Sequence, residues 1–343
     1  MSNTSAGSSY LRDILSQPEY LRGLRSDDIV EAAAPVWRRV GDYSRIILTG
    51  MGASHAALRP LWLSLVAQGR PAWLLDASEL LASCLPLVDA STLVVAASQS
   101  GRSAELVALA EAVAERGGKL LAITNDAESP LARRSAATVD IRAGTESTVS
   151  TKTYVNTLAV GLILGRPASG PAPDQVLRQA ADGIEAYLQD WQRHVTELHD
   201  AVGLPERLYF LARGTSLAAA ECGALITKEA AKWPVEALSA AQFRHGPLEL
   251  ADPRLSVIIL GGEDAAARDL NRRLYRDLAG YGARTHWLDS GGDGGALSLP
   301  AMPTGTRPLA EIVPLQLLTV AIAENAGLEP GVFRHLTKVT TVL

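Results

Sequence analysis

Basic charge is not in excess in this chain of 343 residues, and cysteines and aromatic residues are scarce. Lysine and arginine total 32 against 37 aspartate and glutamate residues, so the formal charge of −5 offers no basic surface for a nucleic acid. The two cysteines, Cys84 and Cys222, lie in apolar surroundings without CxxC spacing. This usage indicates a reducing compartment and no structural zinc.

Long hydrophobic runs and a leader pattern are also lacking. No apolar stretch reaches the roughly 18 residues that a membrane-spanning helix needs. The N-terminus has no charged segment followed by an apolar core. We therefore expect a cytoplasmic protein that binds neither membrane nor nucleic acid. Its length suits two ordinary domains or one large one, and either can bury a core.

Short apolar runs alternate with helical patterns along the first half of the chain. This alternation predicts an α/β fold with a parallel sheet that helices cover on both faces. A first helix should begin near Tyr10 and stop at Pro18, because proline lacks the amide proton that a helix interior needs. The expected strands are 45–49, 72–75, 93–97, 119–124 and 138–142. The longer helices are expected near 26–40, 56–67, 104–114, 153–164, 174–202 and 217–232.

The second half of the chain repeats the first. The Gly-Ala-Ser segment at 52–54 matches Gly-Thr-Ser at 214–216, 162 positions later, and the apolar run 94–97 matches 257–260, 163 positions later. A nearly constant offset predicts two copies of one α/β domain. The predicted organisation is an N-terminal segment over 1–25, a first domain over 26–167 and a second domain over 174–343, with a linker-like stretch between them.

The stretch 93–103 combines a buried strand, a turn rich in hydroxyl groups and the start of a helix. Three serines and Gln99 surround Gly101, where the backbone can turn tightly. A phosphate at that helix N-terminus would be held by amide groups, by the helix dipole and by the hydroxyls. One serine alone would favour a simple helix cap, but the cluster favours a ligand. The matching turn in the second half, 261–264, carries two acids, so only the first copy should bind phosphate.

Two other patterns are weaker. Gly50-x-Gly52-x-x-His55 resembles a dinucleotide fingerprint, with Asp76 near the end of the next strand, but the third glycine is missing. His194 and His199 are five residues apart and so fall on different faces of a helix, which favours a solvated surface over a metal site.

Three further polar residues could carry chemistry. Glu229 shares a helix face with an apolar stripe, and partial desolvation there would favour a general base. The alternative is an ion pair with Lys232, three residues on. His245 lies in a turn closed by Gly-Pro, where it is either a structural hydrogen-bonding residue or an acid/base group. Lys338 precedes a strand-like C-terminal run, where a lysine is usually solvated.

Taken together, these residues resemble the sugar isomerase (SIS) domain family in its double-domain form. The chain is most similar to the isomerase half of glucosamine-6-phosphate synthase and to SIS-type glucosamine-6-phosphate deaminases. The resemblance implies two tandem flavodoxin-like subdomains, each a parallel sheet flanked by helices. Its marks keep one order along the chain: Ser-Gln-Ser-Gly at 98–101, Ala-Gly-Thr-Glu at 143–146, Arg-Gly at 213–214, Lys-Glu at 228–229, Phe-Arg-His-Gly-Pro at 243–247 and Lys-Val-Thr at 338–340.

The resemblance also implies roles for individual residues. Glu229 would move a proton between C1 and C2, His245 would open the sugar ring, and Lys338 would contact the open-chain sugar. His245 would come from the neighbouring subunit, which implies a homodimer with composite active sites, and no cofactor or metal is expected. The implied phosphate ligands are Ser54, Ser98, Gln99, Ser100 and Ser103. Other implied substrate contacts are Gly52, Ala53, Val149 and Ser150.

The expected function is the conversion of glucosamine 6-phosphate to fructose 6-phosphate and ammonia. Glucosamine-6-phosphate synthase carries a lysine one helical turn before the glutamate, where this chain has Ile226. This departure keeps fructosamine-6-phosphate deglycases, which resemble the chain in the same glutamate and histidine pair, as an alternative. A sugar-phosphate sensor without catalysis is the third hypothesis.

Overall fold

The computed structural model describes residues 7–166, 171–290 and 295–338, and the chain divides into two compact units. The first unit comprises Tyr20–Glu146, Lys152–Gln175 and His335–Leu343. The second unit comprises Met1–Glu19, Ser147–Thr151 and Val176–Arg334. Each unit therefore combines separate stretches of the chain, whereas the expected domains were continuous ranges. The described start of the chain belongs to the second unit, and residues 335–338 belong to the first.

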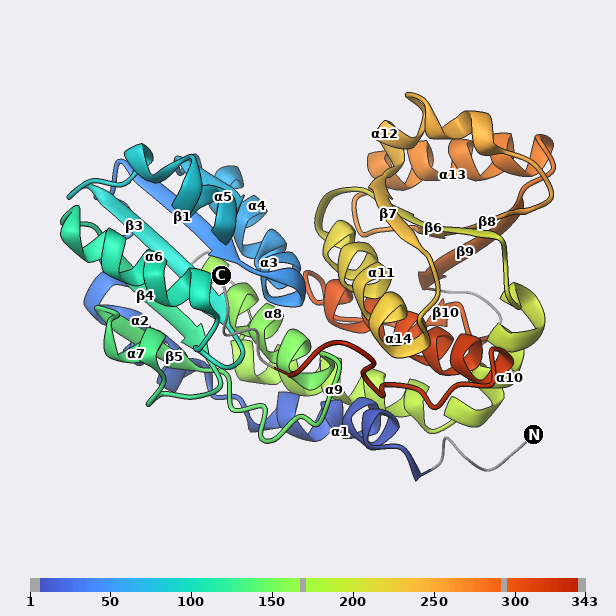
Figure 1. Cartoon of the computed structure of the whole chain (residues 1–343), viewed down its shortest axis with the longest axis horizontal. Helices are drawn as coiled ribbons and strands as arrows, with labels where there is room; N and C mark the ends of the chain where they lie inside the picture. Colours follow the sequence, from blue (N-terminus) through green and yellow to red (C-terminus); the bar gives the residue numbers. More distant parts are fainter. Residues whose placement is uncertain (1–6, 167–170, 291–294, 339–343) are drawn as a thin grey trace. The chain divides into compact units, whose positions relative to one another are not determined.

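The first unit is built on a sheet of five parallel strands in the order β2-β1-β3-β4-β5. The central strand β3 is buried at every position, as expected for a strand with helices on both faces. Figure 1 shows α5 and α6 on one face and α2 and α8 on the other. The strands are β1 (Arg45–Gly50), β2 (Ala72–Asp76), β3 (Thr92–Ser98), β4 (Lys119–Thr124) and β5 (Ala137–Asp140).

The second unit contains a parallel sheet of the same topology. Its order is β10-β9-β8-β6-β7, which becomes 2-1-3-4-5 when read from the other edge, as in the first sheet. Leu211 pairs with Ile259 here as Thr49 pairs with Ala96 in the first sheet, so the repeat extends to strand register. The strands are β6 (Arg207–Ala212), β7 (Glu236–Ser239), β8 (Leu255–Leu260), β9 (Arg284–Ser290) and β10 (Ser298–Leu299). The predicted tandem α/β fold is confirmed.

Helices cover both faces of each sheet (Figure 1). Those of the first unit are α2 (Ser26–Trp37), α3 (Gly52–Ala57), α4 (Arg59–Ala67), α5 (Ala77–Ala82), α6 (Ala104–Glu115), α7 (Pro130–Arg133) and α8 (Lys152–Gly165). Those of the second unit are α10 (Trp191–Val202), α11 (Leu217–Ala231), α12 (Ala240–Phe243), α13 (Ala265–Gly280) and α14 (Arg307–Asn325). The ranges of α1 (Ser9–Gly23) and α9 (Pro173–Leu188) each cross a boundary between the units.

Two helix predictions need correction. The helical pattern at 174–202 is two helices, α9 and α10, which are separated at residues 189–190. Helix α1 does not stop at Pro18 but continues to Gly23. The expected C-terminal strand-like run lies outside the described residues from 339 onward, and so does the middle of the linker-like stretch, 167–170.

A side chain explains how α1 tolerates its internal proline. Pro18 has no amide proton for the carbonyl of Ile14, one helical turn earlier. The side-chain amide of Gln17 donates to that carbonyl oxygen instead, at 2.9 Å. Gln17 also exchanges two hydrogen bonds with Gln316 of α14, at 2.8 and 3.0 Å, and both side chains are fully buried. The helix continues because a neighbouring residue supplies the missing donor.

Within the described ranges, no helix combines the length and the apolar character that crossing a membrane requires. Cys84 is half-buried and Cys222 is buried, and neither forms a disulfide bond.

We predict that Gln17→Leu lowers the midpoint of thermal unfolding by about 4 °C or more. The substitution leaves the Gln316 amide and the Ile14 carbonyl buried without their partner, at a cost of about 1 to 3 kcal/mol for each group. Gln189→Leu, at an exposed position of the same unit, is the matched control and should change the midpoint little. Calorimetry of both variants checks the prediction, and equal midpoints would contradict it.

Candidate functional site

The loops that follow β1 and β3 lie next to each other in the first unit. Strand β1 pairs with β2 on one side and with β3 on the other, so the strand order reverses here. In the pairing of β1 with β3, Gly50 lies opposite Ala97. The loops after β1 and β3 therefore lie at one carboxyl edge, at a topological switch point, where parallel α/β sheets bind ligands. Gly52, Ala53 and Ser54 follow β1, and the expected phosphate-binding turn follows β3.

The turn at 98–103, here called the serine turn, is held by its own hydroxyl groups. The Ser98 Oγ atom accepts a hydrogen bond from the Gly101 amide at 3.1 Å and lies 3.4 Å from the Ser103 Oγ atom. Ser100 Oγ accepts from the amide of Arg102 at 3.2 Å. Neither Ser100 nor Ser103 caps α6 with its side chain. The simple capping role is therefore absent, and Ser98, which is buried, shapes the turn from inside.

Gly101 is required for this geometry. Its φ is +60°, and a Cβ atom there would lie 2.0 Å from the Ser129 Oγ atom. Ser129 is itself fixed, because its hydroxyl caps α7 by accepting the amide of Ala132 at 3.3 Å. Any side chain at position 101 would displace one of the two segments.

Charges beside the serine turn are paired within the protein. The guanidinium of Arg102 donates to the carboxylate of Asp126 at 2.8 Å. This hydrogen bond lowers the pKa of Asp126 below its usual range. With Arg102 engaged, amides and hydroxyls remain the main donors that the turn can offer an anion.

Asn125, which the sequence analysis did not select, connects the serine turn to the loop that follows β5. Its backbone amide donates to the Gln99 carbonyl at 3.0 Å. Its side chain accepts from the amide of Ala143 at 2.8 Å and donates to the carbonyl of Gly144 at 2.7 Å. The position at the carboxyl end of β4, next to the end of β3, was the signal that could have identified it.

A cavity of about 500 Å³ opens beside these residues. It is lined by Gln99, Asn125, Asp140, Arg142, Gly144, Thr145 and Glu146. Arg142 has a φ of +49°, unusual for a residue with a side chain, and forms an ion pair with Asp28 at 2.9 Å. The lining of the cavity therefore includes a cation, paired with Asp28, and the carboxylate of Asp140 as well as Gln99.

Lys338 belongs to the first unit, together with the serine turn. Its ammonium lies 2.7 Å from the carboxylate of Glu146, which is fully buried. The Lys338 side chain is 26% exposed, so it is not fully solvated as a lone lysine near a chain end usually is. Glu146 ends the Ala-Gly-Thr-Glu motif at 143–146, and a single acid in an otherwise uncharged polar loop is the sequence signal for its role.

The other predicted catalytic residues belong to the second unit. Glu229 is half-buried on α11, and the ammonium of Lys232 donates to its backbone carbonyl and to that of Val332. His245 is exposed in the turn after α12, where Gly246 has a φ of +129°. Val149, which is buried, and Ser150, which is half-buried, are also assigned to this unit. Ile226 is fully buried in α11.

The second switch point has the same topology but a charged interior. Arg307 is buried between two carboxylates, 2.8 Å from Glu311 and 2.6 Å from Asp289. Ser216, which follows β6, donates to Glu311 at 2.9 Å. Burial raises the pKa of the Glu311 carboxyl, and the Arg307 charge opposes that rise. The protein's own arginine and carboxylates therefore occupy this edge of the second sheet.

The two acids of the matching turn are used locally. Asp264 caps α13 by accepting the amide of Ala267 at 2.7 Å, and Glu263 accepts the amide of Gly305 at 3.0 Å.

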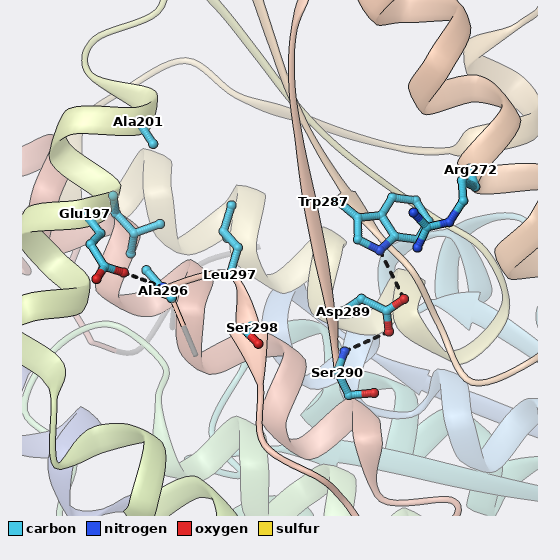
Figure 2. Close-up of a pocket in the computed structure, with 11 residues that line it drawn as sticks. Glu197, Ala201, Arg272, Trp287, Asp289, Ser290, Ala296, Leu297 and Ser298 are labelled. Carbon is cyan, nitrogen blue, oxygen red and sulfur yellow. Dashed lines mark hydrogen bonds between the residues drawn. The ribbon is translucent and has the colours of Figure 1, made fainter. Parts of the chain in front are cut away.

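A pocket of about 350 Å³ lies near Asp289, where the Arg272 guanidinium is 4.4 Å from the centre of the Trp287 ring (Figure 2). None of the predicted site residues lines this pocket.

The weaker sequence patterns have structural explanations. Asp76 caps α5, accepting the amide of Ser78 at 2.9 Å and its hydroxyl at 2.6 Å. His194 is not on a solvated surface as expected, because its ring is buried and stacks on Tyr187 at 4.2 Å. His199 does lie near the surface, 3.0 Å from the carboxylate of Asp200.

Comparison with known proteins agrees with this architecture. The profile described as "SIS domain" matches residues 42–165 and 205–276. The glutamine–fructose-6-phosphate aminotransferase (isomerizing) of Gloeobacter violaceus is 31% identical over 97% of this chain and 58% of its own length. The chain thus spans little more than half the length of that relative.

Two solved structures share the fold. The C-terminal domain of glucosamine-fructose-6-phosphate aminotransferase from Francisella tularensis has a TM-score of 0.81 at 22% identity, covering 96% of this chain and 99% of that one. Glucosamine-6-phosphate deaminase from Thermotoga maritima has a TM-score of 0.74 at 19% identity, covering 97% and 99%. The profile match over more than half of the residues and the two repeated parallel sheets establish that the chain belongs to the SIS domain family.

Proposed function

We propose that the protein is an amino-sugar phosphate deaminase of the aldose–ketose isomerase type. It would convert glucosamine 6-phosphate and water to fructose 6-phosphate and ammonia. The observation that carries the proposal is the serine turn, whose hydroxyls surround a glycine at a topological switch point and do not cap the helix that follows. The similarity to an aminotransferase that acts on fructose 6-phosphate supports the same class of substrate.

The proposed mechanism begins with the phosphate, which does not react. Held by Ser54, Gln99 and the serine turn, it would anchor the substrate so that binding energy positions C1 and C2. His245 of a neighbouring subunit would open the ring in a homodimer with composite sites, which agrees with its exposure here. Glu229 would take the proton from C2 and return it to C1, leaving an imine at C2. Water then adds to the imine carbon and ammonia leaves.

A second candidate is a deglycase for fructosamine 6-phosphates. The cavity of about 500 Å³ beside Gln99 favours it, because a substituted amine needs more room than ammonia does. Arg142 at the cavity would pair with a carboxylate on such a substituent by exchanging its partner Asp28 for it. In this reaction the proton would move from C1 to C2, leaving an imine at C1. Water would then add to C1 and the amine would leave, giving glucose 6-phosphate.

Turnover of a panel of hexosamine and fructosamine 6-phosphates decides between the candidates. We expect ammonia and fructose 6-phosphate from glucosamine 6-phosphate. Glucose 6-phosphate formed only from a fructosyl-amino acid 6-phosphate would establish the deglycase instead. If sugar phosphates bind and none reacts, the protein is a sensor and both enzymatic proposals fail.

We predict that Glu229→Gln lowers kcat by about 10² to 10⁴-fold, the usual contribution of a general base. The affinity for glucosamine 6-phosphate should stay within about threefold, because the amide keeps the shape of the carboxylate. Steady-state kinetics and calorimetric titration measure the two effects. Glu236→Gln, at an exposed position of the same unit, is the control. A rate for Glu229→Gln equal to that of the wild type would remove Glu229 from the mechanism.

We predict that Gly101→Ala weakens binding of the sugar phosphate by about tenfold or more, because the new methyl group overlaps Ser129 and the serine turn must shift. The matched control is Gly69→Ala. Gly69 has a similar φ of +73°, but a Cβ atom there meets nothing within 4 Å. The control should therefore cost some stability without changing affinity. Equal affinities for the two variants would argue against phosphate binding at the serine turn.

A further inference from the structure

Glu146 is a buried carboxylate, and Thr153 and Lys338 donate hydrogen bonds to it. The backbone amide of Thr153 donates to its Oε1 atom at 3.0 Å, and the Thr153 hydroxyl donates to its Oε2 atom at 2.7 Å. The ammonium of Lys338 donates to Oε2 at 2.7 Å. The Glu146 side chain is 0% exposed, whereas that of Lys338 is 26% exposed.

The two partners differ in how firmly they are held. A buried carboxylate is costly unless it is paired and hydrogen-bonded. Thr153 is the second residue of α8, so its amide and the positive end of the helix dipole stabilise the Glu146 charge. These contacts hold the carboxylate within the body of the first unit. Lys338 reaches it on a long flexible side chain, and the described residues 326–338 contain neither helix nor strand. Glu146 is therefore the fixed partner and Lys338 the docked one.

The fixed partner is connected to the serine turn through short contacts. Asn125 holds Gln99 of the turn through its backbone and holds Ala143 and Gly144 through its side chain. Gly144 lies two residues before Glu146, and both border the cavity beside Gln99. A change in the position of Glu146 would therefore alter the position of Lys338 relative to the serine turn.

We propose that Glu146 is the positioning residue that docks Lys338 beside the phosphate-binding turn of the same unit. Lys338 is then in place for the open-chain sugar before the substrate arrives. Substrate binding therefore costs less conformational entropy than it would if the C-terminal segment had to become ordered at the same time. The catalytic part of this inference rests on the proposed function. The docking itself does not.

The first test measures docking without turnover. An amine-reactive reagent is applied to the protein under limiting conditions, and modification of Lys338 is followed by peptide mass spectrometry, with the exposed Lys119 as internal reference. We expect Glu146→Gln to raise the rate at Lys338 by about tenfold relative to Lys119, because removal of one partner frees the other. Glu146→Asp should give a smaller increase. Glu111→Gln, which breaks an exposed ion pair with Arg134 in the same unit, should give none.

The second test measures the consequence for catalysis. On a substrate that the panel identifies, we expect Glu146→Gln to lower kcat by about tenfold or more while KM stays within about threefold. Lys338→Met should lower kcat at least as much, and adding Glu146→Gln to it should have little further effect. Additive losses, or equal losses of kcat and phosphate affinity, would indicate a merely structural Glu146 and overturn the proposal.

The two tests fail in different ways. If no substrate turns over but Lys338 becomes reactive in Glu146→Gln, the proposed function is wrong and the docking stands. If the labelling rate of Lys338 is unchanged in a variant with a normal thermal midpoint, the docking is wrong whatever the enzyme does. Thr153→Val, which removes one donor to Glu146 and keeps the side-chain shape, provides a second variant should Glu146→Gln fail to fold.

Discussion

The close approach of Gly101 and Ser129 is the constraint on which the rest of the first unit's site depends. The backbone leaves β3 and must turn within a few residues to enter α6, and the space that a side chain would occupy is filled by the hydroxyl that caps α7. The turn can therefore close only over a glycine with a positive φ. Once the turn is closed, Ser98 accepts the amide of Gly101 and Ser100 accepts that of Arg102, while Gln99 lines the neighbouring cavity. The shape of the candidate site therefore depends on a steric condition at Gly101.

The two units show how one topology can carry different side chains at the same edge of its sheet. Both sheets have a switch point between their first and third strands, where a ligand could bind. In the first unit that edge carries hydroxyls, amides and a side-chain amide. In the second unit Arg307 lies between Asp289 and Glu311, so the positive charge that could attract an anion is already neutralised. The difference between the two edges therefore lies in a few side chains and not in the topology.

Much of the architecture was readable from the sequence because it follows from local pattern. The apolar runs, their alternation with helices and the near-constant offset of 162 to 163 residues predict two parallel sheets, and the observed registers agree. The errors have physical causes that lie beyond local pattern. Pro18 does not end α1 because Gln17 replaces the missing donor. His194 is buried because Tyr187 from another helix covers it. Each depends on a residue whose position the sequence pattern alone did not specify.

By itself, the sequence determined the fold class, the repeated domain, the family and the serine turn, because strand period, glycine placement and motif order are properties of neighbouring residues. Only the tertiary structure decided which polar groups cap helices or form ion pairs within the protein. It assigned Asp76 and Asp264 to helix caps, enclosed Arg307 between two acids and paired Lys338 with Glu146, 192 positions away in the chain. Such pairings arise when buried charges must find partners, and burial exists only after the chain has folded.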